Sequence, residues 1–143
     1  MSENNLSIAY IKERNNSLQI NLNLSLPNVI DLRKSQYLLV IQLNTRDFSK
    51  IVIYPIKKKS IIKIVLIGVD IKEEHIEILS EELQNFEIIH TSGLIQKGNE
   101  TFYECYLNLN INDNKYKDLK TSLDTIKNIF NEIKIFEVGL QKI

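Results

Sequence analysis

The sequence has few of the residues that make covalent or metal cross-links. It contains a single cysteine, Cys105, and two histidines among 143 residues. One cysteine excludes an intramolecular disulfide and cannot by itself supply a thiolate zinc site. We therefore expect a reducing environment, which for this chain means the cytoplasm.

Long apolar segments and targeting signals are also lacking. The longest apolar run, 61–69, is interrupted by Lys63 and is much shorter than the roughly 20 residues that cross a bilayer as a helix. The opening MSENNLS has neither the basic start nor the apolar stretch of a signal peptide. We expect no membrane partner and no export.

Enzyme signatures are absent from the sequence. It has no P-loop, no glycine-rich dinucleotide turn, no G-x-S-x-G elbow and no paired histidine motif. Acidic clusters such as Glu73, Glu74 and Glu77 are most simply explained as solvated helix surface. The prediction is a protein that is not an enzyme and has no cofactor.

The formal net charge of zero hides an asymmetry between the two halves. Residues 1–59 carry nine basic and four acidic side chains, a net charge of +5, while residues 60–143 carry nine basic and fourteen acidic ones, a net charge of −5. Such asymmetry indicates a basic module that meets a polyanion, followed by an acidic module that does not.

Short strands with alternating apolar side chains are expected throughout the first half. The expected strands are 7–12, 17–24, 37–43 and 50–56. Asn15 and Asn16 separate the first two, and asparagine tolerates a positive φ better than any residue except glycine. Fewer than 60 residues, all in short strands, cannot form a good hydrophobic core alone. We therefore expect an obligate dimer.

The second half predicts the order strand, helix, two strands, helix, strand. The expected helices are 72–86 and 112–130, with apolar stripes formed by Ile76, Leu79, Leu83 and Phe86 and by Leu119, Leu123, Ile126 and Phe130. A turn at 97–100 contains a glycine that we expect at positive φ. This βαββαβ order is typical of the ferredoxin-like fold. The fold class is therefore α+β, with the domains 1–56 and 61–143 joined by a linker at 57–60.

Three blocks of the first half resemble the AbrB/MazE/SpoVT family of swapped-hairpin DNA-binding proteins. Residues 11–23 (IKERNNSLQINLN) align without a gap with the family segment I-K-R-W-G-N-S-L-x-V-R-I-P. Residues 31–38 (DLRKSQYL) and 50–55 (KIVIYP) align with the next two blocks. The resemblance implies half of a dimeric swapped-hairpin β-barrel that binds DNA, with the usual short helix interrupted at Pro27.

The residues themselves also indicate DNA binding. In the expected strand 17–24, Leu18, Ile20 and Leu22 share one face and Gln19, Asn21 and Asn23 share the other. Asn and Gln can read adenine in the major groove, whereas Lys and Arg hold phosphates. The predicted DNA-binding residues are Lys12, Arg14, Asn15, Asn16, Gln19, Asn21 and Asn23. The alternative is a polar sheet face that is rich in Asn only because of genome composition.

The second half is similar in architecture to ACT-type and NikR-like regulatory domains. That similarity implies an effector site after the first strand, where Gly68, Val69 and Asp70 are the candidates. The alternative is a plain dimerisation domain. A lone histidine or a buried cysteine is usually structural, so His75, His90 and Cys105 are not predicted to bind a metal.

The leading prediction is a cytoplasmic homodimeric transcriptional regulator whose partners are DNA, a second copy of the chain and a small-molecule effector. An antitoxin-like protein-interaction module is the first alternative. A structural oligomerisation protein is the second. The operator sequence, the effector and any assembly beyond a dimer are not encoded in a recognisable motif.

Overall fold

The computed structural model describes residues 7, 9–14, 16, 18–24 and 36–141, and all statements below concern these residues. The chain divides into two units, Met1–Ile30 and Asp31–Ile143. The second unit contains all of the helices and strands that the structure describes. Our predicted domain boundary at 57–60 stays a prediction, and the residues on both sides of it belong to this second unit.

The elements of the second unit follow the order expected from the sequence. They are β1 (Tyr37–Asn44), β2 (Ser49–Ile56), β3 (Ile61–Val69), α1 (Glu73–Leu83), β4 (Ile88–Lys97), β5 (Glu100–Leu107), α2 (Lys115–Thr125) and β6 (Glu132–Val138). Both helices are shorter than predicted. Phe86, Ile126 and Phe130 therefore reach the core from the turns that follow the helices rather than from the helices themselves.

Strands β3 to β6 form one antiparallel sheet in the order β4-β5-β3-β6. β4, which follows β3 in the sequence, therefore lies at one edge of the sheet, and β5 lies between β4 and β3. With a helix after the first and third of these strands, this order is the ferredoxin-like arrangement. The turn between β4 and β5 contains Gly98 at φ 63°, which confirms the predicted positive φ.

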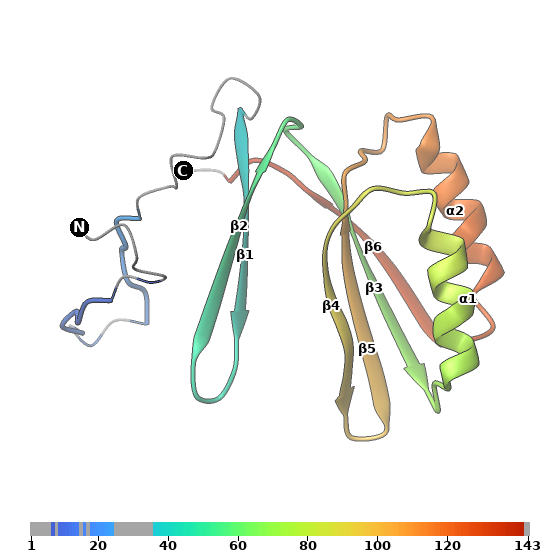
Figure 1. The fold of residues 1–143 in the computed structure, drawn as a ribbon, viewed down its shortest axis with the longest axis horizontal. Helices are drawn as coiled ribbons and strands as arrows, with labels where there is room; N and C mark the ends of the chain where they lie inside the picture. The colour runs from blue at the N-terminus through green and yellow to red at the C-terminus, as the bar shows by residue number, and fades with distance from the viewer. Residues whose placement is uncertain (1–6, 8, 15, 17, 25–35, 142–143) are drawn as a thin grey trace. The chain divides into compact units, whose positions relative to one another are not determined.

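The main core lies between this sheet and the two helices, which cover the same face of the sheet (Figure 1). Ile62, Ile64 and Leu66 of β3 are fully buried there. Leu79 and Leu83 of α1 and Leu119 and Leu123 of α2 pack against them. Both predicted helical stripes therefore face the core, although Ile76 at the start of the first is exposed.

Strands β1 and β2 form a separate antiparallel hairpin, with Leu39 opposite Tyr54 and Ile41 opposite Val52. The hairpin lies on the side of the sheet away from the helices (Figure 1). Leu39 packs there with Ile61 of β3 and Tyr106 of β5 in a second, smaller core. The face of the sheet that no helix covers is therefore partly covered by the hairpin.

The predicted strands 7–12 and 17–24 are wrong for the residues that the structure describes, none of which is in a strand. Leu18 is 96% exposed and Ile20 59% exposed, so the described residues of the first unit do not cover this apolar face. A two-stranded hairpin without a covered face is marginal in water. The predicted turn is better supported, since Asn16 has φ 56°. Asn15 and Pro27 lie outside the described residues.

The predicted linker is anchored to the ferredoxin-like part through one lysine. The Lys58 ammonium donates hydrogen bonds to the Asn108 carbonyl oxygen at 3.1 Å and to Asp113 Oδ2 at 2.9 Å. The hydrogen bond from Lys58, followed by one from the Asn110 N–H, lowers the pKa of the Asp113 carboxyl. The start of β3 is thus tied to the loop between β5 and α2.

Replacing Lys58 by methionine should raise the pKa of Asp113 towards its ordinary value. Because that pKa is lowered in the folded protein, the stabilisation is present above the pKa of the unfolded chain and is lost as pH falls through the folded value. A side-chain carboxyl NMR titration measures the change. Lys57→Met is the matched control, and an Asp113 titration that is the same in both variants would contradict this assignment.

Candidate functional site

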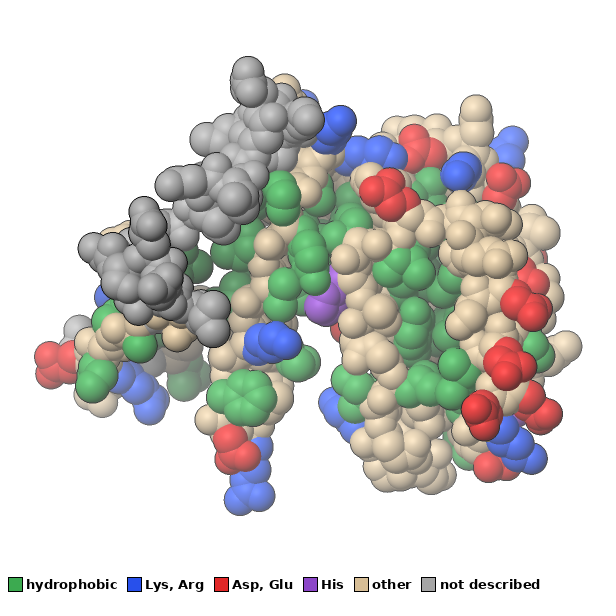
Figure 2. Space-filling view, viewed as in Figure 1, with side chains coloured by type: hydrophobic (Ala, Val, Ile, Leu, Met, Phe, Trp, Pro, Cys, Tyr) green, Lys and Arg blue, Asp and Glu red, His purple; other side chains and the backbone are tan. Residues whose placement is uncertain are grey.

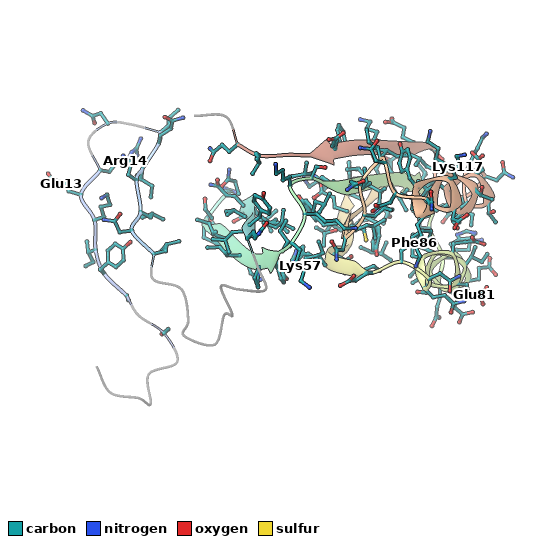
Figure 3. The ribbon with its side chains drawn as sticks, turned by 90° about the horizontal axis from the view of Figure 1, so that it is seen from above. Glu13, Arg14, Lys57, Glu81, Phe86 and Lys117 are labelled. Carbon is teal, nitrogen blue, oxygen red and sulfur yellow. The ribbon has the colours of Figure 1, made fainter. Side chains whose placement is uncertain are left out.

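The polar residues predicted to bind DNA are exposed in the first unit. The described members are Lys12, Arg14, Asn16, Gln19, Asn21 and Asn23. The side chain of Glu13 points to the opposite side of the backbone from that of Arg14 (Figure 3). Outside a strand these residues are not held on one regular face, so their common orientation stays a prediction.

The β1–β2 hairpin has apolar side chains on both of its faces. Leu39, Ile41 and Tyr54 point towards the sheet. The opposite, outer face consists of the pairs Leu38 with Pro55, Val40 with Ile53 and Gln42 with Ile51. On this outer face Leu38 is 43% exposed, Val40 57% and Ile51 40%. A hairpin that was simply a cover for the sheet would be expected to turn polar residues to water.

Two aromatic side chains connect the hairpin to the sheet. The Tyr54 hydroxyl of β2 lies 2.8 Å from Nδ1 of His90 in β4, and the two rings are 5.6 Å apart. The His90 ring is also 6.1 Å from that of Tyr106 in β5. His90 is therefore held between the two aromatic residues, one from each side of the junction.

A charged pair lies beside these aromatic rings. Lys63 Nζ of β3 is 3.3 Å from Glu104 Oε1 of β5 and 5.5 Å from the centre of the ring of Tyr106, the residue opposite Lys63 in the sheet. The side chains of Lys63 and Glu104 are partly exposed, whereas Tyr106 is buried. The outer face of the sheet thus offers a mixed surface of one cation, one anion and an aromatic ring to the hairpin.

None of these junction residues was singled out from the sequence as functional. Tyr54 and His90 are 36 residues apart, and no local spacing relates them. The available signal was a histidine within an otherwise strand-forming segment, 88–97. We interpreted it only as a structural residue.

The predicted effector residues lie at the end of β3 and in the turn before α1. A Cβ atom on Gly68 would come within 2.5 Å of Ile71 Cδ1 and 3.2 Å of Phe130 Cδ1. Close packing therefore accounts for this glycine. Val69 is exposed and Asp70 adopts φ 58°. An effector role for these three residues stays a prediction.

The three residues weighed as metal ligands occupy separate places. His75 Nδ1 accepts a hydrogen bond from the Lys72 N–H at 3.0 Å at the start of α1. Cys105 is fully buried in the main core, and burial raises the pKa of its thiol to about 11, which keeps it protonated. Within the described ranges no three His, Cys, Asp or Glu side chains are grouped as a metal site.

A hollow lies between α1 and the edge strand β4. Its volume is about 520 Å³, and the apolar side chains of Ile76, Ile88 and Leu94 are exposed along it. Tyr103 lines its floor, and burial raises the pKa of the Tyr103 hydroxyl. No charged side chain lines this hollow.

No protein-family model matches the chain, and no curated protein matches it. A solved structure of an unknown protein from Galdieria sulphuraria is similar over 59% of this chain and 46% of its own, with 16% identity and a TM-score of 0.41. A dimeric ferredoxin-like protein of unknown function from Thermobifida fusca is similar over 59% of this chain and 94% of its own, with 14% identity and a TM-score of 0.39. The chain spans less than half the length of the first. The ferredoxin-like assignment therefore rests on the strand order.

Among the helices of the described residues, none has the length and apolar character needed to cross a membrane.

Replacing Gly68 by alanine should lower the free energy of unfolding by about 1–3 kcal/mol, the usual cost of overpacking. The added methyl group meets Ile71 Cδ1, an atom that valine lacks. The double variant Gly68→Ala/Ile71→Val should therefore recover part of the loss, with Ile71→Val alone as the control. Urea denaturation of the original protein, the two single variants and the double variant gives the coupling free energy between the two positions. Additive losses would show that the contact with Ile71 is not what excludes a side chain.

Proposed function

We propose that the protein is a cytoplasmic, homodimeric DNA-binding transcriptional regulator. Residues 1–56 act as a swapped-hairpin module that dimerises and binds DNA. Residues 61–143 act as a regulatory domain that dimerises and senses a small molecule. The observation that carries this proposal is the apolar surface that is exposed in the described part of residues 1–56.

This uncovered surface comes from two separate segments. The outer face of the hairpin exposes Leu38, Val40 and Ile51, and the segment 18–24 exposes Leu18 and Ile20. In the segment 18–24 the apolar residues alternate with polar ones, which is the pattern of a strand with one covered face, whereas the hairpin is apolar on both faces and packs its inward face against the sheet. A second copy of the same chain is the simplest cover for a surface of this kind, because swapped hairpins bury one another.

The polar residues of the segment 18–24 then take up the DNA-binding role. When the apolar residues are buried in a dimer, the intervening Gln19, Asn21 and Asn23 turn to the outside together. Their carboxamides can donate to and accept from adenine edges, while Lys12 and Arg14 contact phosphates. The net charge of +5 over residues 1–59 favours approach to a polyanion.

The protein should bind duplex DNA with an affinity that falls steeply as salt rises, because phosphate contacts release counterions. Filter binding over a series of salt concentrations measures the slope. Lys12→Ala should reduce the slope by about one for each phosphate contact removed. Lys127→Ala, at an exposed position in the second unit, is the matched control.

Asn21→Ala should instead relax the sequence preference, with selection from a random DNA pool as the measurement and Asn128→Ala as its control. Absence of DNA affinity at low salt would refute DNA binding. A protein that co-purifies in place of DNA would favour the antitoxin-like alternative. Variants of Arg14 and Asn21 that change no interaction would favour a purely structural protein.

Val40→Lys should dissociate the proposed dimer, because it places a charge in the centre of the apolar outer face of the hairpin. Analytical ultracentrifugation should show a dimer for the original protein and a shift towards monomer, at least tenfold in the dissociation constant, for this variant. Val69→Lys is the matched control, since Val69 is 42% exposed and lies at the end of β3 rather than in the hairpin. A Val40→Lys protein that associates as strongly as the control would place the interface elsewhere.

A further inference from the structure

A cleft of about 330 Å³ separates the inward face of the β1–β2 hairpin from the outer face of the sheet. Figure 2 shows the molecule hollowed between these two parts of the second unit. Ile41, Lys50 and Val52 line the hairpin wall, and Lys63, Glu104 and Tyr106 line the sheet wall. The hairpin and sheet therefore meet at Tyr54 and His90 but diverge beyond them.

The charges that face the cleft are not balanced. Lys63 is already compensated by Glu104 at 3.3 Å, and His90 is engaged by the Tyr54 hydroxyl at 2.8 Å. Lys50 enters from the opposite wall, on the same face of the hairpin as Ile41 and Val52, and has no ion pair within the described part of the chain. Among the described residues that line the cleft, Lys50 is thus the cation without a compensating anion, which suits a single negative charge.

Besides these groups, the cleft has two walls lined by apolar side chains together with the polar side chains of Gln42, Thr91 and Ser92. Ile41 and Val52 form one wall, and Tyr106 and Ile95 lie on the other. A flat or branched apolar group between these walls would be buried on both sides. A phosphate ester with two charges would exceed the single charge of Lys50, the cation of the cleft for which the described residues supply no ion pair, and a cationic molecule would be repelled by it.

We propose that this cleft binds a small monocarboxylate with an aromatic or branched apolar body. The carboxylate accepts a charge-assisted hydrogen bond from the Lys50 ammonium, and the body lies between Ile41 and Val52 on one side and the Tyr106 ring on the other. The ligand touches both walls and so holds the hairpin to the sheet. The site does not depend on the proposed DNA binding, and its test uses the protein without DNA.

The test is a titration of the full chain, labelled with ¹⁵N, with phenylacetate as the probe. Saturable amide shifts are expected at Lys50, Val52 and Glu104, with a dissociation constant in the millimolar range for a molecule of this size. Phenylacetamide and 2-phenylethylamine, which have the same body without the negative charge, should bind at least tenfold more weakly.

Lys50→Gln should weaken phenylacetate binding roughly tenfold, and Lys50→Arg should retain it. Lys57→Gln, at another exposed lysine of the same region, should leave it unchanged. The amide spectrum of each variant shows that it is folded before binding is measured.

Three results would overturn the proposal. They are no saturable shift with phenylacetate, equal binding of the acid and its amide, and equal binding by the Lys50→Gln and Lys57→Gln variants. Shifts confined to Ile76, Ile88 and Leu94 would also overturn it, because they would place the carboxylate in the hollow between α1 and β4.

Discussion

The burial of β3 on both of its faces is the constraint on which the second unit depends. Ile62, Ile64 and Leu66 pack under the two helices, while Ile61 on the other face packs against Leu39 and Tyr106. An antiparallel sheet commonly leaves one face in water, but a strand with apolar residues on both faces cannot do so without cost. A helical layer alone therefore does not complete this fold. The β1–β2 hairpin supplies part of the second cover.

This second cover has consequences for the hairpin. Among the described strands, β1 and β2 pair with each other and with no third strand, so the hairpin has one face towards the sheet and one face away from it. Both faces are apolar, so packing against the sheet satisfies only half of its apolar surface. The same geometry produces the cleft, since a twisted hairpin touches a twisted sheet at Tyr54 and His90 and separates from it further along. The junction, the cleft and the exposed apolar outer face thus all follow from the packing of the hairpin on the sheet through one of its two faces.

The candidate sites differ in how far sequence reasoning could reach them. The polar residues between Lys12 and Asn23 were found because they alternate with apolar ones over a short segment. That alternation predicted a strand, yet Leu18 and Ile20 are exposed and the described residues there are not in a strand. The junction of Tyr54, His90 and Tyr106 was missed for the opposite reason. It is well packed, but it joins segments whose sequence spacing carries no pattern.

Local interactions in the sequence determined the order of the six strands and two helices of the second unit, the inward stripes of both helices and the positive φ at Gly98. These features depend on the period of apolar residues and on the steric freedom of one residue, both of which can be recognised over a few positions. The tertiary structure decided which face of the sheet the hairpin covers, which residues form the cleft, and that Gly68 is required by the packing of Ile71 and Phe130. Those outcomes depend on contacts between segments far apart in the chain, where many pairings satisfy the same local pattern and only the combined burial of all the segments selects one.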